Sequence, residues 1–303
     1  MPAMNEQLRS PCLAWLFRTE LLLEIFVAIN LAVLTGNIWF AHSANQFHNP
    51  AEYIPLYFSA DAPILLLVAM LAKDRWRSQD AWRDIGLLVG GLSILIGLAG
   101  VVFHLRSGVF PARPPRSLPY AAPFVAPLAY VGLGLLLLMN RMVAAYTVKW
   151  ARWVILFAAG GFFGNFILCV TDHAINGFIL KAEWIPVVSS ALATDFLILP
   201  IICKVTRRYL DLCLFVIGLQ ALVGFLGFAI HLRRNYFIPG ISLFEMFVYG
   251  APPMAPLLFP DLAMLALIGL WQLAPHFPPA ASDEHQGIFD RLLRWATVAP
   301  ANQ

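Results

Sequence analysis

Charged residues are scarce in this chain, and their scarcity excludes most classes of soluble protein. Only 12% of the 303 residues are Asp, Glu, Lys or Arg, whereas 60% are hydrophobic and the mean hydropathy is +0.74. A typical soluble domain has about 25% charged residues. The composition therefore predicts an integral membrane protein surrounded by lipid. The net charge of +3 is too small to indicate nucleic acid as a partner.

Cysteine is also scarce, and several familiar motifs are absent. The four cysteines, Cys12, Cys169, Cys203 and Cys213, form no disulfide framework, no zinc pattern and no C-x-x-C-H motif for covalent haem. The sequence has no phosphate loop and no dinucleotide fingerprint. We expect no cleavable signal peptide, because the first 19 residues are mixed and charged and the first apolar run is long enough to cross a membrane.

Apolar stretches fill most of the chain. A helix needs about 20 apolar residues to cross the hydrocarbon layer. Eight stretches meet this length, at residues 20–42, 53–72, 85–104, 121–140, 151–172, 184–203, 212–231 and 251–273. The sequence therefore predicts an all-α integral membrane protein with eight transmembrane helices.

Lys and Arg are distributed unevenly between the two sides of these helices. Fourteen fall on the side that holds both termini and six on the other. Cytoplasmic loops carry the excess of Lys and Arg. We therefore expect a multi-pass protein of the bacterial inner membrane with both termini in the cytoplasm.

Three motifs of the first half return in the second half in the same order. The first, H-x-x-N-x-F followed by A-E-(Y/W)-I-P, runs over 42–55 and again over 173–186. The second, G-x-x-G-x-x-x-H-L-R, runs over 97–106 and 224–233, and A-P-x-x-A-P-L runs over 122–128 and 251–257. The offsets are 131, 127 and 129 residues. This order and spacing predict two tandem four-helix repeats that enter the membrane with the same orientation.

The repeats divide the chain into four parts. A cytoplasmic N-terminal segment, 1–19, precedes a first four-helix repeat over 20–145 and a second over 146–273. The tail 274–303 has apolar residues on one face between 283 and 298, so we expect an amphipathic segment along the cytoplasmic membrane surface.

Polar residues that return in both repeats are the candidate site, because ionisable groups near lipid are costly to keep. They lie at the predicted outer ends of the helices. The set comprises His42, Glu52, His104, Arg106, His173, Glu183, His231 and Arg233. Each repeat thus offers two imidazoles, one carboxylate and one arginine to the periplasmic side.

Haem b is the first interpretation of this set. His42 and His104 would be one axial pair, and His173 and His231 a second. Gly100 and Gly227 lie one turn before the second histidine of each pair, where a macrocycle needs room. Arg106 and Arg233 would meet the haem propionates.

Three other kinds of site use the same residues. Two histidines and Glu52 or Glu183 could hold iron, zinc or copper in each repeat. A quinone could bind among His, Glu and Tyr53 or Trp184. Alternatively, Glu52 pairs with Arg106 and Glu183 with Arg233, and the protein is a non-catalytic anchor or assembly subunit.

A transporter is the remaining hypothesis. Asp61, Asp195 and Asp261 lie within predicted spans and could form a proton path. The favoured hypothesis is a membrane subunit of an electron-transfer system with a site at the periplasmic face. Its partner would be a periplasmic or membrane protein. Whether the chain is an enzyme, and which electron donor it uses, stay open.

Overall fold

The computed structural model describes residues 18–75, 77–106, 125–175, 177–237, 240 and 242–277. All regular structure among these residues is helical. The principal helices are α2 (Thr19–Ser43), α3 (Tyr53–Asp74), α4 (Gln79–His104), α6 (Leu128–Met142), α7 (Val148–Ile175), α8 (Trp184–Ile202), α9 (Arg207–Tyr236), α10 (Leu243–Tyr249) and α11 (Leu258–Leu273). Short 3-10 turns are η2 (Pro50–Glu52), η5 (Lys181–Glu183), η6 (Ala255–Leu257) and η7 (Ala274–His276).

Seven of these helices, with their adjoining turns, are long and apolar enough to cross a membrane. They are built on α2, α3, α4, α7, α8, α9 and α11. The predicted all-helical membrane character is therefore confirmed for the described residues. Helix α6 is shorter, with 15 residues, and such a helix rises about 22 Å, less than the roughly 30 Å of a hydrocarbon core. The predicted tail segment 283–298 lies outside the described residues.

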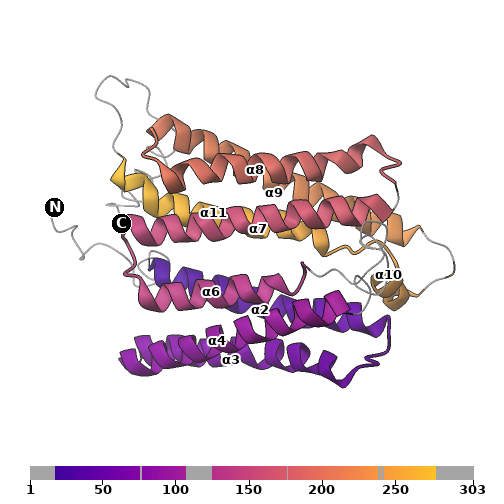
Figure 1. Ribbon diagram of the computed structural model, residues 1–303, viewed down its shortest axis with the longest axis horizontal. Coiled ribbons are helices and arrows are strands. Elements are labelled where there is room, and N and C mark those ends of the chain that lie inside the picture. The colour runs from indigo at the N-terminus through magenta and orange to yellow at the C-terminus, as the bar shows by residue number, and fades with distance from the viewer. Residues whose placement is uncertain are drawn as a thin grey trace, which may run out of the picture.

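The helices pack as two layers that run along the long axis of the molecule (Figure 1). In one layer α2 contacts α3 and α6, and α4 contacts α3 and α6. In the other, α7 contacts α8 and α11, and α9 contacts α8 and α11. The layers meet where α6 touches α7 and where α2 touches α11. Each contact in the first layer thus has a counterpart in the second.

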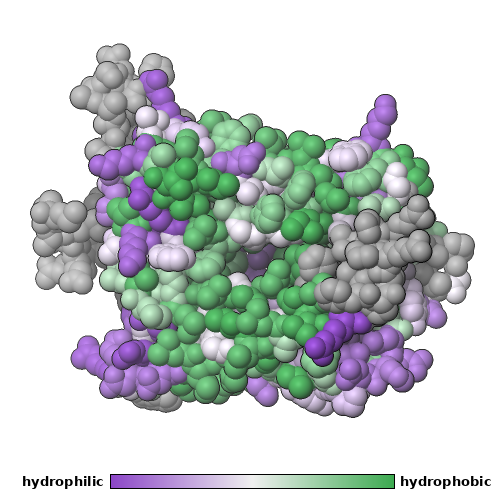
Figure 2. Space-filling view, viewed as in Figure 1, coloured by the Kyte–Doolittle hydropathy of each residue, from purple (hydrophilic) through white to green (hydrophobic). Residues whose placement is uncertain are grey.

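Apolar side chains face both the interior and the surroundings. Trp150, Phe162 and Phe259 are almost fully buried. Many other large apolar side chains are exposed along the helices, including Ile64, Leu95 and Phe225. Figure 2 shows apolar surface around the middle of the molecule and hydrophilic side chains gathered at both ends. This pattern is typical of helices that span a bilayer.

The helix ends have local causes. Ser78 and Thr206 cap α4 and α9 with side-chain oxygens that accept the Ala81 and Tyr209 backbone N–H. Pro55 lies in the first turn of α3, where the missing N–H is not needed. The final A-P-L of the third motif leads directly into α6 and, through η6, into α11. The positions of these helix ends determine where the candidate histidines and carboxylates lie along the long axis of the molecule.

Candidate functional site

His42, Glu52 and His104 come together at one end of the first layer. His42 and His104 lie in the last turns of α2 and α4, and Glu52 ends the turn before α3. The ring centroids of His42 and His104 are 6.3 Å apart, with the ring planes at 71°. His42 Nδ1 lies 3.2 Å from Glu52 Oε2, and Asn45 Nδ2 donates to Glu52 Oε1 at 3.0 Å. The sequence prediction that these residues are neighbours is therefore met within this layer.

The Glu52 carboxylate is only half satisfied. Its Oε1 accepts the Asn45 amide, but the Oε2 contact with His42 is not aligned as a hydrogen bond. Among the described residues Oε2 is a buried atom without a hydrogen-bond partner. The equivalent oxygen of Glu183 is in the same condition. Such atoms are costly to bury, so both carboxylates are available to accept a further proton donor.

A tight turn after α2 holds His42 in place. The Phe47 N–H donates to the His42 carbonyl at 3.0 Å and lies 3.2 Å from Asn45 Oδ1. Gln46 and Phe47 both have positive φ, 58° and 51°, a conformation that residues other than glycine seldom adopt. Phe47 stacks on Tyr53 with ring centroids 4.7 Å apart. The turn is thus a fixed feature that joins the end of α2 to the start of α3.

The second copy of this motif has the same local structure. The Phe178 N–H donates to the His173 carbonyl at 3.2 Å, and Phe178 has a φ of 53°. Phe178 stacks on Trp184 at 4.2 Å, as Phe47 stacks on Tyr53. Gly177 takes the first positive-φ position, with φ 66°, where the first copy has Gln46.

His173, Glu183 and His231 also lie near one another. His173 is within electrostatic range of both Glu183 and His231. His231 lies inside α9, and its Nδ1 is 2.9 Å from the Pro252 carbonyl oxygen. A backbone carbonyl near Nδ1 favours the tautomer whose Nδ1–H is donated and whose Nε2 carries a free lone pair.

The glycines before the second histidines pack against prolines, so these positions themselves offer no open space. A Cβ on Gly100 would lie 2.8 Å from Pro127 Cβ, and one on Gly227 would lie 2.9 Å from Pro256 Cβ. Gly97 and Gly224 pack in the same way. An added Cβ would lie 2.9 Å from the Pro127 carbonyl oxygen at Gly97 and 2.7 Å from the Pro256 carbonyl oxygen at Gly224. The G-x-x-G motif is a helix-packing motif: it lets α4 approach α6, and α9 approach η6 and α11.

The two arginines take no part in either cluster. Arg106 is exposed just after α4, and the Arg233 guanidinium lies 5.9 Å from the Phe237 ring centroid. Glu52 instead contacts His42 and Asn45. The ion pair between Glu52 and Arg106 expected by the anchor interpretation is therefore not formed.

Direct ligation by three side chains has no support in the geometry. Among the described residues, no group of three or more His, Cys, Asp and Glu is arranged to hold a metal ion. The carboxylate of Glu52 lies beside His42 Nδ1, so it is placed to orient that imidazole and not to share a metal with it. Within the part of the chain that the structure describes, each half accordingly places two imidazoles near one another without a third such side chain arranged to share a metal with them.

The acids of the proposed proton path do not meet. Asp61 and Asp195 are exposed on α3 and α8. Asp261 instead accepts a hydrogen bond from Asn30 Nδ2 at 2.9 Å, which joins α11 to α2 across the two layers. These three acids therefore line no common interior path.

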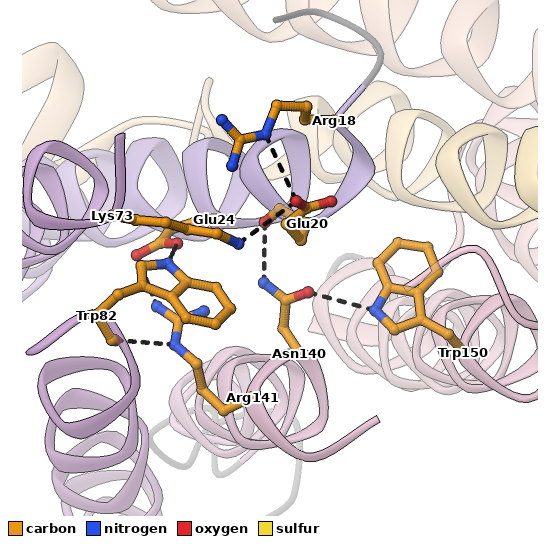
Figure 3. Close-up of polar contacts among 8 residues, drawn as sticks. All are labelled: Arg18, Glu20, Glu24, Lys73, Trp82, Asn140, Arg141 and Trp150. Atoms are coloured by element: carbon orange, nitrogen blue, oxygen red, sulfur yellow. Dashed lines mark hydrogen bonds and ion pairs between the residues drawn. The ribbon is translucent and has the colours of Figure 1, made fainter. Parts of the chain in front are cut away.

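A charged cluster at the opposite end of the first layer was not predicted (Figure 3). Arg141 Nη2 lies 2.7 Å from Glu24 Oε1, and both side chains are fully buried. Trp82 Nε1 donates to Glu24 Oε2 at 2.6 Å. Arg141 and Lys73 lie 3.7 and 3.6 Å from the Trp82 ring centroid. Glu24 within an apolar run was the only sequence signal, and because this cluster is not duplicated, the search for repeated polar residues missed it.

Comparison with known proteins gives no relative for this chain. No family model, no curated protein and no solved structure matches it.

Proposed function

We propose that the chain is a membrane subunit of a redox system and that paired histidines bind a transition metal at its periplasmic face. A metal–nitrogen bond of about 2.0–2.1 Å puts a bound imidazole centroid about 3 Å from the metal, so two opposite imidazoles have centroids about 6 Å apart. The 6.3 Å between His42 and His104 is the observation that carries the proposal.

The surroundings of the histidines support it. Metal-bound histidines usually present the other ring nitrogen to a carboxylate or a backbone carbonyl. His42 Nδ1 faces the Glu52 carboxylate, and His231 Nδ1 faces the Pro252 carbonyl. The hydrogen bond to Pro252 favours a free Nε2 lone pair on His231 for a metal, and the Glu52 carboxylate lies where it could do the same for His42.

Iron or copper suits an electron-transfer role, since imidazole binds both and zinc has no redox chemistry. The spacing of the imidazoles also fits haem iron, but the glycines that were to make room for it are packed against proline. We therefore favour a metal ion without a macrocycle. When bound, it would supply an electron-accepting centre on one side of the membrane, open to a periplasmic or membrane partner.

The proposal includes two tandem four-helix repeats and eight spans, with both termini in the cytoplasm of a bacterial inner membrane. Matching turns after His42 and His173, matching glycine–proline contacts and matching helix contacts support the repeat. Two such repeats would bring both histidine pairs to the same side.

Metal analysis and an absorption spectrum of the purified protein test the proposal. We expect iron or copper at one or two ions per chain and no Soret band. Replacing both His42 and His104 with Gln should remove one ion, whereas His48→Gln, an exposed and unduplicated histidine of the same loop, should remove none. If zinc is the only metal found, the redox role is excluded. A Soret band would instead favour haem as the cofactor. An unchanged metal content in the double variant would show that His42 and His104 do not bind the metal.

Quinone binding is a second candidate because of one observation. Tyr57 stacks on Tyr53, which stacks on Phe47, with centroids 6.0 and 4.7 Å apart. Tyr57 is 64% exposed, so the stack reaches the surface of the molecule, near the turn that holds the unsatisfied Glu52 oxygen. A quinone would use the ring face for stacking and the Glu52–His42 pair to accept protons. A metal-free protein that binds a quinone analogue would favour this candidate.

A further inference from the structure

A pocket of 240 Å³ opens beside the charged cluster, at the end of the molecule opposite the histidines. All four helices of the first layer reach it. Glu20 and Trp82 lie in the first turns of α2 and α4, and Lys73 and Arg141 lie in the last turns of α3 and α6. Its rim is apolar and is formed by residues 142–145, among which Met142 is 77% exposed. A charged floor with an apolar rim at a helix end is the arrangement that meets the headgroup region of a bilayer.

The buried charges of this pocket are balanced. Two buried cations, Lys73 and Arg141, face two buried carboxylates, Glu20 and Glu24, with side chains between 0 and 14% exposed. Arg18, which is 36% exposed, adds a third cation, with its Nε 3.6 Å from Glu20 Oε1. Lys73 Nζ lies 3.4 Å from Glu20 Oε1. Burying a further net charge here would be costly. A zwitterionic group, which carries one charge of each sign, can pair with both kinds of side chain.

Two buried atoms of residues that line the pocket have unused hydrogen-bonding capacity. Arg141 Nη1, a donor, and Glu20 Oε2, an acceptor, are buried without a hydrogen-bond partner among the described residues. Arg141 otherwise donates through Nε to the Trp82 carbonyl and through Nη2 to Glu24. Its side chain is 0% exposed, so it cannot turn to water. A zwitterionic group would satisfy both atoms, since it offers an anionic acceptor to Arg141 Nη1 and a cationic donor to Glu20 Oε2.

We propose that this pocket binds a phosphoethanolamine headgroup, with its phosphate toward Arg141 and Lys73 and its ammonium toward Glu20. A phosphate accepts charge-assisted hydrogen bonds from Arg and Lys. A primary ammonium donates three hydrogen bonds, whereas a choline group donates none. The apolar rim would contact the acyl chains of a phospholipid in the adjoining leaflet. This site is independent of the metal proposed at the other end.

Lipid binding to the purified full-length protein tests this site. Native mass spectrometry and thermal unfolding in detergent would compare phosphatidylethanolamine, phosphatidylcholine and phosphatidylglycerol with identical acyl chains, and free phosphoethanolamine. We expect phosphatidylethanolamine to bind about tenfold more tightly than phosphatidylcholine, as the loss of one charge-assisted hydrogen bond implies. Stabilisation by free phosphoethanolamine at the same concentration would identify a soluble ligand with the same chemistry.

Variants link the preference to the pocket. Lys73→Gln and Glu20→Gln should each weaken phosphatidylethanolamine binding about tenfold. Lys204→Gln is the matched control, because Lys204 is exposed and follows α8 as Lys73 closes α3. Ala145→Phe, which fills the pocket without removing a charge, should abolish the preference in a folded protein. An equal response to all three lipids, or a preference that survives in Ala145→Phe, would overturn the proposal.

Discussion

At the scale of single residues, the two halves differ where Glu24 meets Arg141. Their side chains form a fully buried ion pair at 2.7 Å. The motif offsets of 131 and 129 residues align them with Ile155 and Leu270, which are buried and apolar. A buried ion pair often stabilises a fold no better than apolar residues of similar volume. Stability alone therefore does not explain the charged version in the first half, which is consistent with the binding role proposed for the pocket beside it.

This comparison gives a prediction for the free energy of unfolding. Glu24→Gln should lower it by about 3–5 kcal/mol, because the buried Arg141 charge loses its partner. The double variant Glu24→Ile with Arg141→Leu, which copies the second half, should be clearly more stable than Glu24→Gln. Denaturant unfolding in detergent would measure both. Equal stability of the single and double variants would mean that the pair is not coupled as described.

Tyr146, in the loop between α6 and α7, extends the same cluster. Burial raises the pKa of its phenol, and the neighbouring Glu20 carboxylate raises the pKa further. The hydroxyl therefore stays neutral beside Glu20 at physiological pH. Residues far apart in the sequence, at the starts of α2 and α4 and the ends of α3 and α6, build this region together, which is why no local motif could reveal it.

At the scale of helices, small residues decide how closely the neighbours approach. Gly90 and Gly134 bring α4 and α6 together, since a Cβ on Gly134 would lie 2.5 Å from the Gly90 carbonyl oxygen. Gly97 and Gly224 repeat this role against the third motif in each half. Spacing alone identified these glycines as important, but it could not tell a packing contact from room for a cofactor, because only the position of Pro127 and Pro256 decides between the two.

Two substitutions in α4 separate these roles. Gly97→Ala should lower the free energy of unfolding by about 1–3 kcal/mol through overpacking, because a Cβ would lie 2.9 Å from both Pro127 O and Val131 N. Gly91→Ala is the matched control in the same helix. It has open space around it and should be neutral or stabilise by up to about 1 kcal/mol. Thermal unfolding in detergent would measure both, and equal midpoints for the two variants would contradict the packing role.

Helix positions follow the hydropathy of the sequence closely, whereas their ends depend on contacts. Helix α6 begins at Leu128 and not near 121, after the prolines of the third motif. Helix α9 continues past His231 to Tyr236, so His231 lies inside a helix. The short helix α10 was not predicted, although Ser242 and Glu245 form a capping box. That hydrogen bonding with Ser242 also lowers the pKa of Glu245. A seven-residue helix has too little hydropathy pattern to stand out.

At the scale of the whole molecule, function depends on which side of the membrane each end faces. The histidine clusters of both halves lie at one end of the helices, and the charged cluster lies at the other (Figure 1). Equal depth would confine both proposed metal sites to one side, so they could not form an electron path through the bilayer. This conclusion requires that α6 crosses the membrane despite its 15 residues. If it does not, the two halves enter with opposite orientations.

Cysteine labelling decides this point. In a background without native cysteines, Asn45→Cys after α2 and Lys181→Cys after α7 should both react with an impermeant thiol reagent from the periplasm. Gln79→Cys and Lys204→Cys should react only after the membrane is opened, and all four positions are exposed. Between residues 45 and 181 the chain passes through α3, α4, α6 and α7, so four crossings return it to the same side. If Asn45→Cys and Lys181→Cys react from opposite sides, α6 does not span, and a parallel repeat with two sites on one face is excluded.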